Sequence, residues 1–152
     1  MKILITGAAG FIGSQLAYKL WTQKEDIILI DNFSYGKEDN LIFPDKDFTK
    51  EIIKGDIRDR ELMESIIKDG KFDVILHIAG IAPLPDCQSN PNLALDVNVG
   101  GTLNILELSR KYGVKKIIFA STTAIYENDK VFPSKEDKFE LVTSNRRQFN
   151  NK

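Results

Sequence analysis

The chain has 152 residues, which suits one domain. Its 42% hydrophobic and 28% charged content is ordinary for a globular protein, and 21 Lys and Arg balance 22 Asp and Glu. That balance argues against nucleic-acid binding by phosphate neutralisation, and no apolar run approaches the roughly 20 residues of a membrane span. A single cysteine and a single histidine exclude an intrachain disulfide and a multi-histidine metal site. Because the N-terminus has no signal-peptide pattern, we expect a soluble, cytoplasmic chain without a metal.

Short apolar runs alternate with helical stripes along the first 121 residues. The apolar runs predict strands at residues 2–6, 27–30, 51–54, 72–78 and 116–121. Helices are predicted over residues 11–21, over a segment capped by Asp59 that ends at Gly70, and over residues 93–112 with Gly113 as the stop. Residues 32–50 and the proline-punctuated segment after the fourth strand read mainly as loops.

This alternation indicates βαβ units and therefore a parallel sheet with helices on both faces. We predict an α/β fold, a three-layer, doubly wound, Rossmann-like sheet of about five strands in the order 3-2-1-4-5. The pattern decays from Glu127 onward. We therefore expect a Rossmann-like domain over residues 1–126 and an irregular tail over residues 127–152.

Three glycines lie between the first strand and the first helix. Gly7 permits a tight turn, Gly10 lets the backbone approach a pyrophosphate, and Gly13 lets the helix pack closely on the strand. The N-terminus of the helix then offers unpaired N–H groups and a favourable dipole to phosphates. Ala9, Phe11 and Ile12 complete this candidate dinucleotide loop. The alternative is a tight turn with a purely structural role.

Asp31 closes the second strand and is the candidate ribose ligand. A carboxylate at this place accepts hydrogen bonds from both hydroxyls of an adenosine ribose and repels a 2′-phosphate, which favours NAD over NADP. Lys37 leaves NADP open, since a nearby cation can neutralise that phosphate. The alternative for Asp31 is a surface turn residue.

Six motifs occur in order along the chain: Thr6-Gly-x-x-Gly-Phe-Ile-Gly13, Asp31-Asn32, Asp56-Ile57-Arg58, His77-Ile-Ala-Gly80, Asn98-Val-x-Gly-Thr102 and Ser121-Thr122-Thr123. Together they resemble the extended short-chain dehydrogenase/reductase family of NAD-dependent nucleotide-sugar epimerases and dehydratases. The resemblance covers residues 1 to about 126 and is greatest to the UDP-glucose 4-epimerase-like members. It implies NAD as the cofactor and a nucleotide-sugar as the substrate.

The resemblance also implies roles for individual residues. Asp56 and Ile57 would meet the adenine, with Asn32 beside Asp31, whereas Ala79 and Gly80 would line the cofactor channel. Asn98 joins this cofactor set, and a polar hydrogen bond between helices or to a loop is its expected role. His77 is interpreted as a structural residue at a strand end. The remaining carried-over role is catalytic: Thr122 would orient the sugar hydroxyl that is oxidised.

The residues after Thr122 distinguish reactions within the family. Dehydratases have an Asp and a Glu there, whereas this chain has Thr123 and Ala124. Without a carboxylate pair for proton transfer, epimerase or simple oxidoreductase chemistry outranks dehydration. Nucleotide-sugar dehydratase or reductase activity remains the alternative.

The general base of the family, a tyrosine with a lysine four residues later, has no match in residues 143–152, which contain no tyrosine. Tyr112 with Lys116 and Tyr126 with Lys130 have the right spacing, and we interpret both as chance matches. Three interpretations compete: a truncated epimerase, a non-catalytic NAD-binding module, and one half of a split enzyme. The first is favoured, so we expect this chain alone to be inactive, and to act as a homodimer or with a completing polypeptide.

Overall fold

The computed structural model describes residues 1–122 of the chain. Residues 1–120 form one compact unit, and residues 121–152 belong to a second. The predicted tail over residues 127–152 and the Tyr126–Lys130 pair lie outside the described residues. No helix within residues 1–122 is long and apolar enough to cross a membrane.

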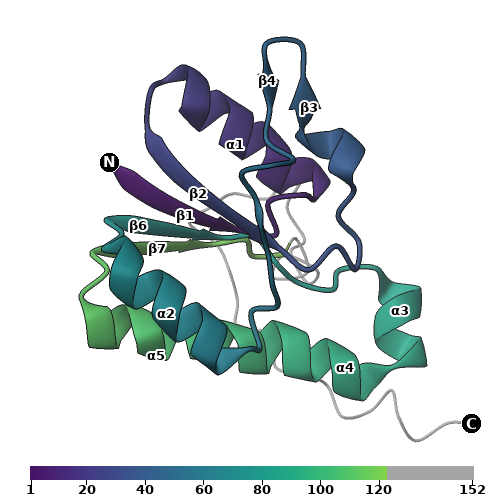
Figure 1. The fold of residues 1–152 in the computed structure, drawn as a ribbon. Helices are drawn as coiled ribbons and strands as arrows, with labels where there is room; N and C mark the ends of the chain where they lie inside the picture. Colours follow the sequence, from purple (N-terminus) through teal and green to yellow (C-terminus); the bar gives the residue numbers. More distant parts are fainter. Residues whose placement is uncertain (123–152) are drawn as a thin grey trace, which may run out of the picture. The chain divides into compact units, whose positions relative to one another are not determined.

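The first unit is built on a parallel sheet (Figure 1). Its strands are β1 (Lys2–Thr6), β2 (Asp26–Asp31), β5 (Ile53–Lys54), β6 (Val74–His77) and β7 (Lys116–Phe119). They lie in the order β5-β2-β1-β6-β7, which is 3-2-1-4-5 when the strands of this sheet are counted along the chain. The predicted architecture and strand order are therefore confirmed. In this register Thr6 pairs with both Ile30 and His77, so the carboxyl ends of β1, β2 and β6 meet at one edge.

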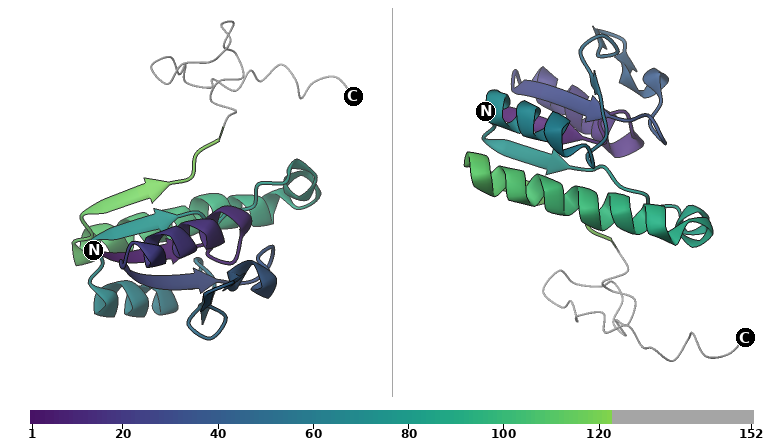
Figure 2. Two further views of the ribbon diagram at one scale, coloured as in Figure 1. Left: turned by 90° about the horizontal axis from the view of Figure 1, so that it is seen from above. Right: turned by 60° about the horizontal axis from the view of Figure 1, so that its bottom comes forward.

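Helices cover both faces of the sheet (Figures 1 and 2). Helix α1 (Phe11–Thr22) covers one face, and α2 (Arg60–Gly70) and α5 (Thr102–Tyr112) lie side by side on the other. Side chains of β1 alternate between the two cores, with Ile3 and Ile5 on the α1 side and Leu4 on the α2–α5 side. Each of these side chains is almost fully buried. This two-sided burial explains why the strand is an unbroken apolar run.

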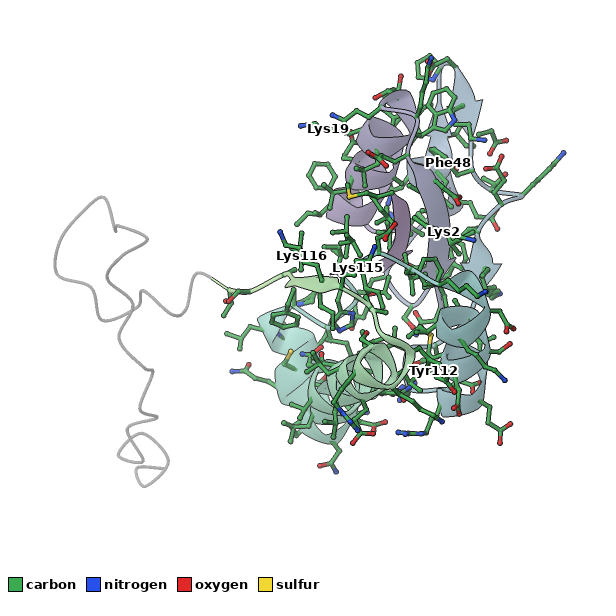
Figure 3. All side chains as sticks on the ribbon, turned by 90° about the vertical axis from the view of Figure 1, so that its left-hand side faces the viewer. Lys2, Lys19, Phe48, Tyr112, Lys115 and Lys116 are labelled. Carbon is green, nitrogen blue, oxygen red and sulfur yellow. The ribbon has the colours of Figure 1, made fainter. Side chains whose placement is uncertain are left out.

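At the amino-terminal ends of the strands, Asp73 holds neighbouring segments together. Its carboxylate accepts hydrogen bonds from the Lys2 backbone N–H at 2.9 Å and from the Lys115 ammonium at 2.6 Å. Figure 3 looks at this end of the sheet, where Lys2, Lys115 and Lys116 lie close together. Asp73 thus connects β1 to the segment that precedes β7 at the amino-terminal ends of the strands.

The ends of the helices follow the predicted signals, and α2 ends at Gly70 as predicted. Asp59 caps α2 by accepting a hydrogen bond from the Leu62 N–H at 3.0 Å, and Gly113 ends α5 with a φ of 72°. The left-handed residue after α2, however, is Lys71, with a φ of 50°, and Gly70 is the last helical residue. A Cβ on Gly70 would lie 2.2 Å from the Phe72 ring, so packing rather than capping requires this glycine.

Four short elements lie in segments that were predicted to be mainly loops, and the prediction missed them. Residues 32–50 contain the 3₁₀ helix η1 (Glu38–Leu41) and a hairpin of β3 (Ile42–Phe43) and β4 (Lys46–Asp47). An aromatic cluster on α1 holds this hairpin, because Phe43 stacks on Tyr18 with 4.2 Å between ring centroids. Phe48, labelled in Figure 3, is buried edge-on against Trp21. Elements this short carry no periodicity that a sequence could reveal.

The fourth unexpected element is α3 (Leu84–Ser89), in the proline-rich segment after β6. Pro85 lies in the first turn of this helix, where a missing N–H is tolerated. The predicted helix over residues 93–112 is a continuous rod of α4 (Pro91–Leu95), a wider π-helical turn η2 (Asp96–Gly101) and α5.

Candidate functional site

A cavity of about 610 Å³ opens at the carboxyl edge of the sheet. It is lined by the glycine loop after β1, the segment after β2, the turn after β5 and the segment after β6. Most of the candidate cofactor residues line it: Gly7, Gly10, Phe11, Ile12, Gly13, Asp31, Asn32, Ile57, Ala79 and Gly80. The structure thus brings together residues from four separate segments of the chain.

Three candidate cofactor residues lie outside this lining, and the catalytic candidate belongs to the other unit. Ala9, Asp56 and Asn98 are not among the residues that line the cavity. Each of them instead holds a neighbouring loop in place, as described below. Thr122 is exposed and lies in the second unit, so its role stays a prediction.

The three glycines have different steric reasons to be glycine. Gly7 has a φ of +69°, and a Cβ there would lie 2.6 Å from the backbone N of Ala79. A Cβ on Gly13 would lie 2.1 Å from the Gly7 carbonyl oxygen, because α1 starts directly against the loop. The turn role of Gly7 and the packing role of Gly13 are therefore confirmed. Gly10 has ordinary extended backbone, and a Cβ there would approach only the Gly7 oxygen, at 3.2 Å.

The N-terminus of α1 opens into the cavity and favours an anion. Gly10 is the N-cap and has no side chain that could satisfy the N–H groups of the first turn. The first turn contains no acidic residue either. The N–H groups and the positive end of the helix dipole are thus left for a ligand, and phosphate is the group that suits them.

Asp31 is positioned by its own hydrogen bonds and is only 8% exposed. One carboxylate oxygen accepts a hydrogen bond from the Ala9 N–H at 2.9 Å, and the other accepts one from the Phe33 N–H at 2.7 Å. Each oxygen has a further lone pair available, so the carboxylate can still accept the hydroxyls of a ligand. Gly36 lies over it, since a Cβ there would be 2.9 Å from Oδ1 of Asp31.

Ala9 is fully buried and connects the glycine loop to the segment after β2. Its carbonyl oxygen accepts hydrogen bonds from the Lys37 N–H at 3.1 Å and from the side-chain amide of Asn40 at 2.8 Å. With its N–H donated to Asp31, Ala9 fixes both the Asp31 carboxylate and the loop beside it. Its contribution is therefore to hold the loop, and not to line the cavity.

Asp56 is already occupied by protein partners. Its carboxylate accepts the Arg58 guanidinium through Nε at 3.0 Å and Nη2 at 2.8 Å, and it also accepts the Asn32 amide at 2.9 Å. The Arg58 hydrogen bonds hold the pKa of Asp56 well below its ordinary value. Arg58, to which the sequence assigned no role, also binds Asp96 at 3.0 Å and itself lines the cavity.

Asn98 holds the segment after β6 from outside the cavity. Its side-chain oxygen accepts a hydrogen bond from the Ile81 N–H at 2.7 Å, and its amide donates to the Ile81 carbonyl at 2.9 Å. This two-point contact is the hydrogen bond to a loop that was expected of Asn98. It sets the position of Gly80 and Ile81, both of which line the cavity.

Two further residues of the cavity lining were not predicted from the sequence as site residues. Tyr35, after β2, and Asp86, in α3, both line the cavity. A hydrogen bond between the phenol and the Asp86 carboxylate raises the pKa of Tyr35. They are far apart in sequence and lie in irregular or unexpected elements, so only the fold reveals their contact.

His77 lies at the end of β6 and is 1% exposed. Burial lowers the pKa of its imidazole from 6.5 to about 4. The groups facing the ring are the hydroxyls of Thr6 and Thr102 and the ring of Phe119, and none of these carries a charge. The folded chain therefore holds this histidine in its neutral form.

We expect the free energy of unfolding to fall by about 2 kcal/mol between pH 7 and pH 5. Below pH 6.5 the unfolded chain takes up a proton at His77, whereas the folded chain does so only near pH 4, so stability is lost as the pH falls through this window. Urea unfolding at several pH values measures it. His77 is the only histidine, so His77→Gln should remove the slope above pH 5. A wild-type chain of constant stability over this range would contradict the buried neutral imidazole.

The cavity thus combines a glycine loop, a helix N-terminus that favours an anion, and a carboxylate that can accept hydroxyls. Ile57, Ile78 and Ile81 add apolar lining. Such a set suits a ligand with a pyrophosphate, a ribose and flat rings. Among residues 1–122, no group of three His, Cys, Asp or Glu side chains is placed to hold a metal ion.

Comparison with known proteins agrees with this geometry. The profile of the family described as "NAD dependent epimerase/dehydratase family" matches residues 3–148. A protein of Methanocaldococcus jannaschii named "Putative UDP-glucose 4-epimerase" is 41% identical over 137 residues, which cover 89% of this chain and 43% of that protein. The chain thus spans about two fifths of the length of the curated relatives it matches.

Two solved structures share the fold. The UDP-glucose 4-epimerase of Thermotoga maritima, solved with UDP-glucose, is 40% identical with a TM-score of 0.79, over 88% of this chain and 42% of that one. The UDP-glucose 4-epimerase of Thermus thermophilus, solved with NAD, is 34% identical with a TM-score of 0.71, over 80% and 38% of the two chains. The sequence match and the shared fold lead to one conclusion: the chain belongs to the NAD dependent epimerase/dehydratase family.

Proposed function

We propose that residues 1–126 are the NAD-binding domain of a nucleotide-sugar epimerase of the UDP-glucose 4-epimerase type. The convergence of the glycine loop, the N-terminus of α1 and Asp31 at the carboxyl edge of the sheet carries this proposal. It is the place where a doubly wound sheet binds a dinucleotide, because the strand order reverses there. The relatives with NAD or UDP-glucose bound support the same assignment.

In this proposal the pyrophosphate lies against Gly10 and the first turn of α1, and Asp31 binds the adenosine ribose. The adenine lies between Ile57 and the Arg58 guanidinium, since both line that end of the cavity and the Asp56 carboxylate is already paired. The nicotinamide end lies along Ala79 and Gly80. Thr122 would orient the hydroxyl of the sugar.

We propose that epimerisation needs further residues in addition to those that bind NAD. Epimerisation needs a base that takes a proton from the sugar hydroxyl while hydride passes to the nicotinamide, and a threonine of ordinary pKa cannot replace a tyrosinate. We therefore propose that this chain binds the cofactor and does not alone turn over a nucleotide-sugar. We also propose that the chain acts as a homodimer or together with a completing polypeptide. An exposed apolar stripe at helical spacing along α4, η2 and α5 supports such a contact; it consists of Leu95, Val99, Leu103 and Leu106.

Calorimetric titration of the chain with NAD and NADP tests the proposed function. We expect Asp31→Asn to weaken NAD binding by about tenfold or more, because charge-assisted hydrogen bonds to the ribose hydroxyls are lost. NADP should be affected less, since the same change removes a repulsion. Asn retains an oxygen acceptor for one of the backbone N–H groups that Asp31 now binds.

Asp26→Asn is the matched control, because Asp26 is an exposed carboxylate at the other end of the same strand. It should leave both affinities unchanged. Equal NAD affinity in the wild type and in Asp31→Asn would refute the placement of the ribose. No measurable NAD binding by the wild-type chain would refute the proposed function of residues 1–126.

A further inference from the structure

The imidazole of His77 lies inside a chain of hydrogen bonds that crosses the unit from β1 to α5. Its Nδ1 is 2.7 Å from Oγ1 of Thr6, and its Nε2 is 3.0 Å from Oγ1 of Thr102. Thr102 continues the chain by donating its hydroxyl to the Asn98 carbonyl at 2.7 Å. At the other end, the Ala79 N–H donates to Oγ1 of Thr6 at 3.3 Å.

Counting protons gives every bond in this chain a direction. A threonine hydroxyl has one hydrogen, and Thr102 gives it to Asn98, so toward His77 it can only accept. Nε2 of His77 therefore carries the ring hydrogen, and Nδ1 is an acceptor for the Thr6 hydroxyl. Every donor then has an acceptor only while the imidazole is neutral and in the Nε2–H form.

Both ends of this chain meet the same wall of the cavity, residues 78–81. Thr6 binds the Ala79 N–H, whereas Asn98, whose carbonyl ends the chain, holds the Ile81 peptide at two points. The wall lies directly against the glycine loop, because a Cβ on Gly7 would meet the Ala79 backbone at 2.6 Å. Because Gly7 and Ala79 both line the cavity, a displacement of this wall relative to the glycine loop changes the shape of the cavity.

We propose that His77 is a positioning residue for the dinucleotide: as a neutral Nε2–H imidazole joining Thr6 to Thr102, it holds residues 78–81 packed against Gly7, in the position that the cofactor requires. This rests on the proposed function, because it takes the dinucleotide as the ligand of the cavity. This role differs from that of a structural residue at a strand end, because the position of residues 78–81 depends on the proton at Nε2 and not only on the volume of the ring.

The first test is the protonation state of the ring. His77 is the only histidine, so ¹⁵N NMR of the imidazole reports one residue without assignment. We expect a single Nε2–H tautomer at pH 7 in the wild type. In Thr102→Val the acceptor of that hydrogen is lost, and the proton should shift toward Nδ1. An Nδ1–H tautomer in the wild type, or no shift in Thr102→Val, would overturn the proposed direction of the chain.

The second test measures whether the hydrogen bonds through His77 stabilise the backbone of residues 78–81. Amide hydrogen exchange at Ala79 should be roughly fivefold to tenfold faster in Thr6→Val, the effect of one lost hydrogen bond. It should also be faster in Thr102→Val, which is separated from Ala79 by the His77 ring. Thr6→Ser and Thr102→Ser keep the hydroxyls and should restore slow exchange. If exchange at Ala79 were faster only in Thr6→Val, the His77 ring would not couple Thr102 to Ala79, and the proposal would be overturned.

The third measurement is NAD affinity in the same variants. We expect both valine variants to weaken NAD binding by roughly fivefold to tenfold, and both serine variants to restore it. Thr22→Val is the control, because Thr22 is exposed and bonds only within α1, to the Lys19 carbonyl. Unchanged affinity with an altered tautomer and faster exchange would overturn the positioning role alone. Absence of NAD binding in the wild type would overturn the proposed function instead, and the first two tests would still decide whether the chain of bonds exists.

Discussion

Gly13→Ala is expected to lower the free energy of unfolding by about 3 kcal/mol, the upper end of the usual effect of overpacking. The new Cβ would lie 2.1 Å from the Gly7 carbonyl oxygen and 2.9 Å from the Cα of Ala8. Both neighbours are backbone atoms of the glycine loop, so relief requires the start of α1 and this loop to move apart. That movement would open the buried α1 side of the sheet, where Ala17 and Leu29 pack. Urea unfolding followed by circular dichroism measures the loss.

Gly100→Ala is the matched control, since it is the same substitution in the helical rod of the same unit. A Cβ on Gly100 would meet only the end of the exposed Asp96 side chain, at 3.3 Å. Alanine is the better helix former by up to about 1 kcal/mol, so this variant should match or exceed the wild type in stability. If Gly13→Ala were as stable as Gly100→Ala, the close packing of α1 on the loop would be disproved.

The glycines also show how far a sequence predicts a structure. Gly7 and Gly13 were assigned correctly because they belong to a local pattern, in which a strand, a turn and a helix follow one another within a few residues. Gly36 and Gly70 have reasons that no local pattern contains. Gly36 leaves room for Ala9 and Asp31, and Gly70 leaves room for the Phe72 ring. These are contacts of the folded chain, so they become visible only in the structure.

The same distinction explains the elements and the site. The sheet was predictable because its three central strands, β1, β2 and β6, are apolar runs that are largely buried. The hairpin of β3 and β4 was missed, since two-residue strands depend on Tyr18 and Trp21 of α1 for their packing. In the site, Asp31 was found from its place at the end of a strand. The pairing of Asp56 with Arg58, and of Tyr35 with Asp86, depends on loop conformations that have no periodic signal.

Gly10→Val is expected to abolish detectable NAD binding, a loss of at least about 100-fold, while the chain still folds. Gly10 has a φ of −74° and a ψ of 168°, which a valine adopts without strain, and a Cβ there would approach only the Gly7 oxygen, at 3.2 Å. Replacing a glycine N-cap by valine costs about 1 kcal/mol of stability at most. The side chain would instead fill the space in front of the first turn of α1, where the pyrophosphate must approach the N–H groups.

This variant separates binding from folding, which Gly13→Ala does not. Calorimetry with NAD should show no heat of binding for Gly10→Val, whereas its urea midpoint should stay close to that of the wild type. Gly10→Ala is the graded control: one methyl group fills less of the approach, so it should weaken binding to an intermediate degree. If Gly10→Val bound NAD as tightly as the wild type, the pyrophosphate would have to lie elsewhere, and the N-terminus of α1 would lose its proposed role. The two glycines differ in what a Cβ would meet: at Gly13 it would lie 2.1 Å from the Gly7 carbonyl oxygen, whereas at Gly10 it would approach only that oxygen, at 3.2 Å.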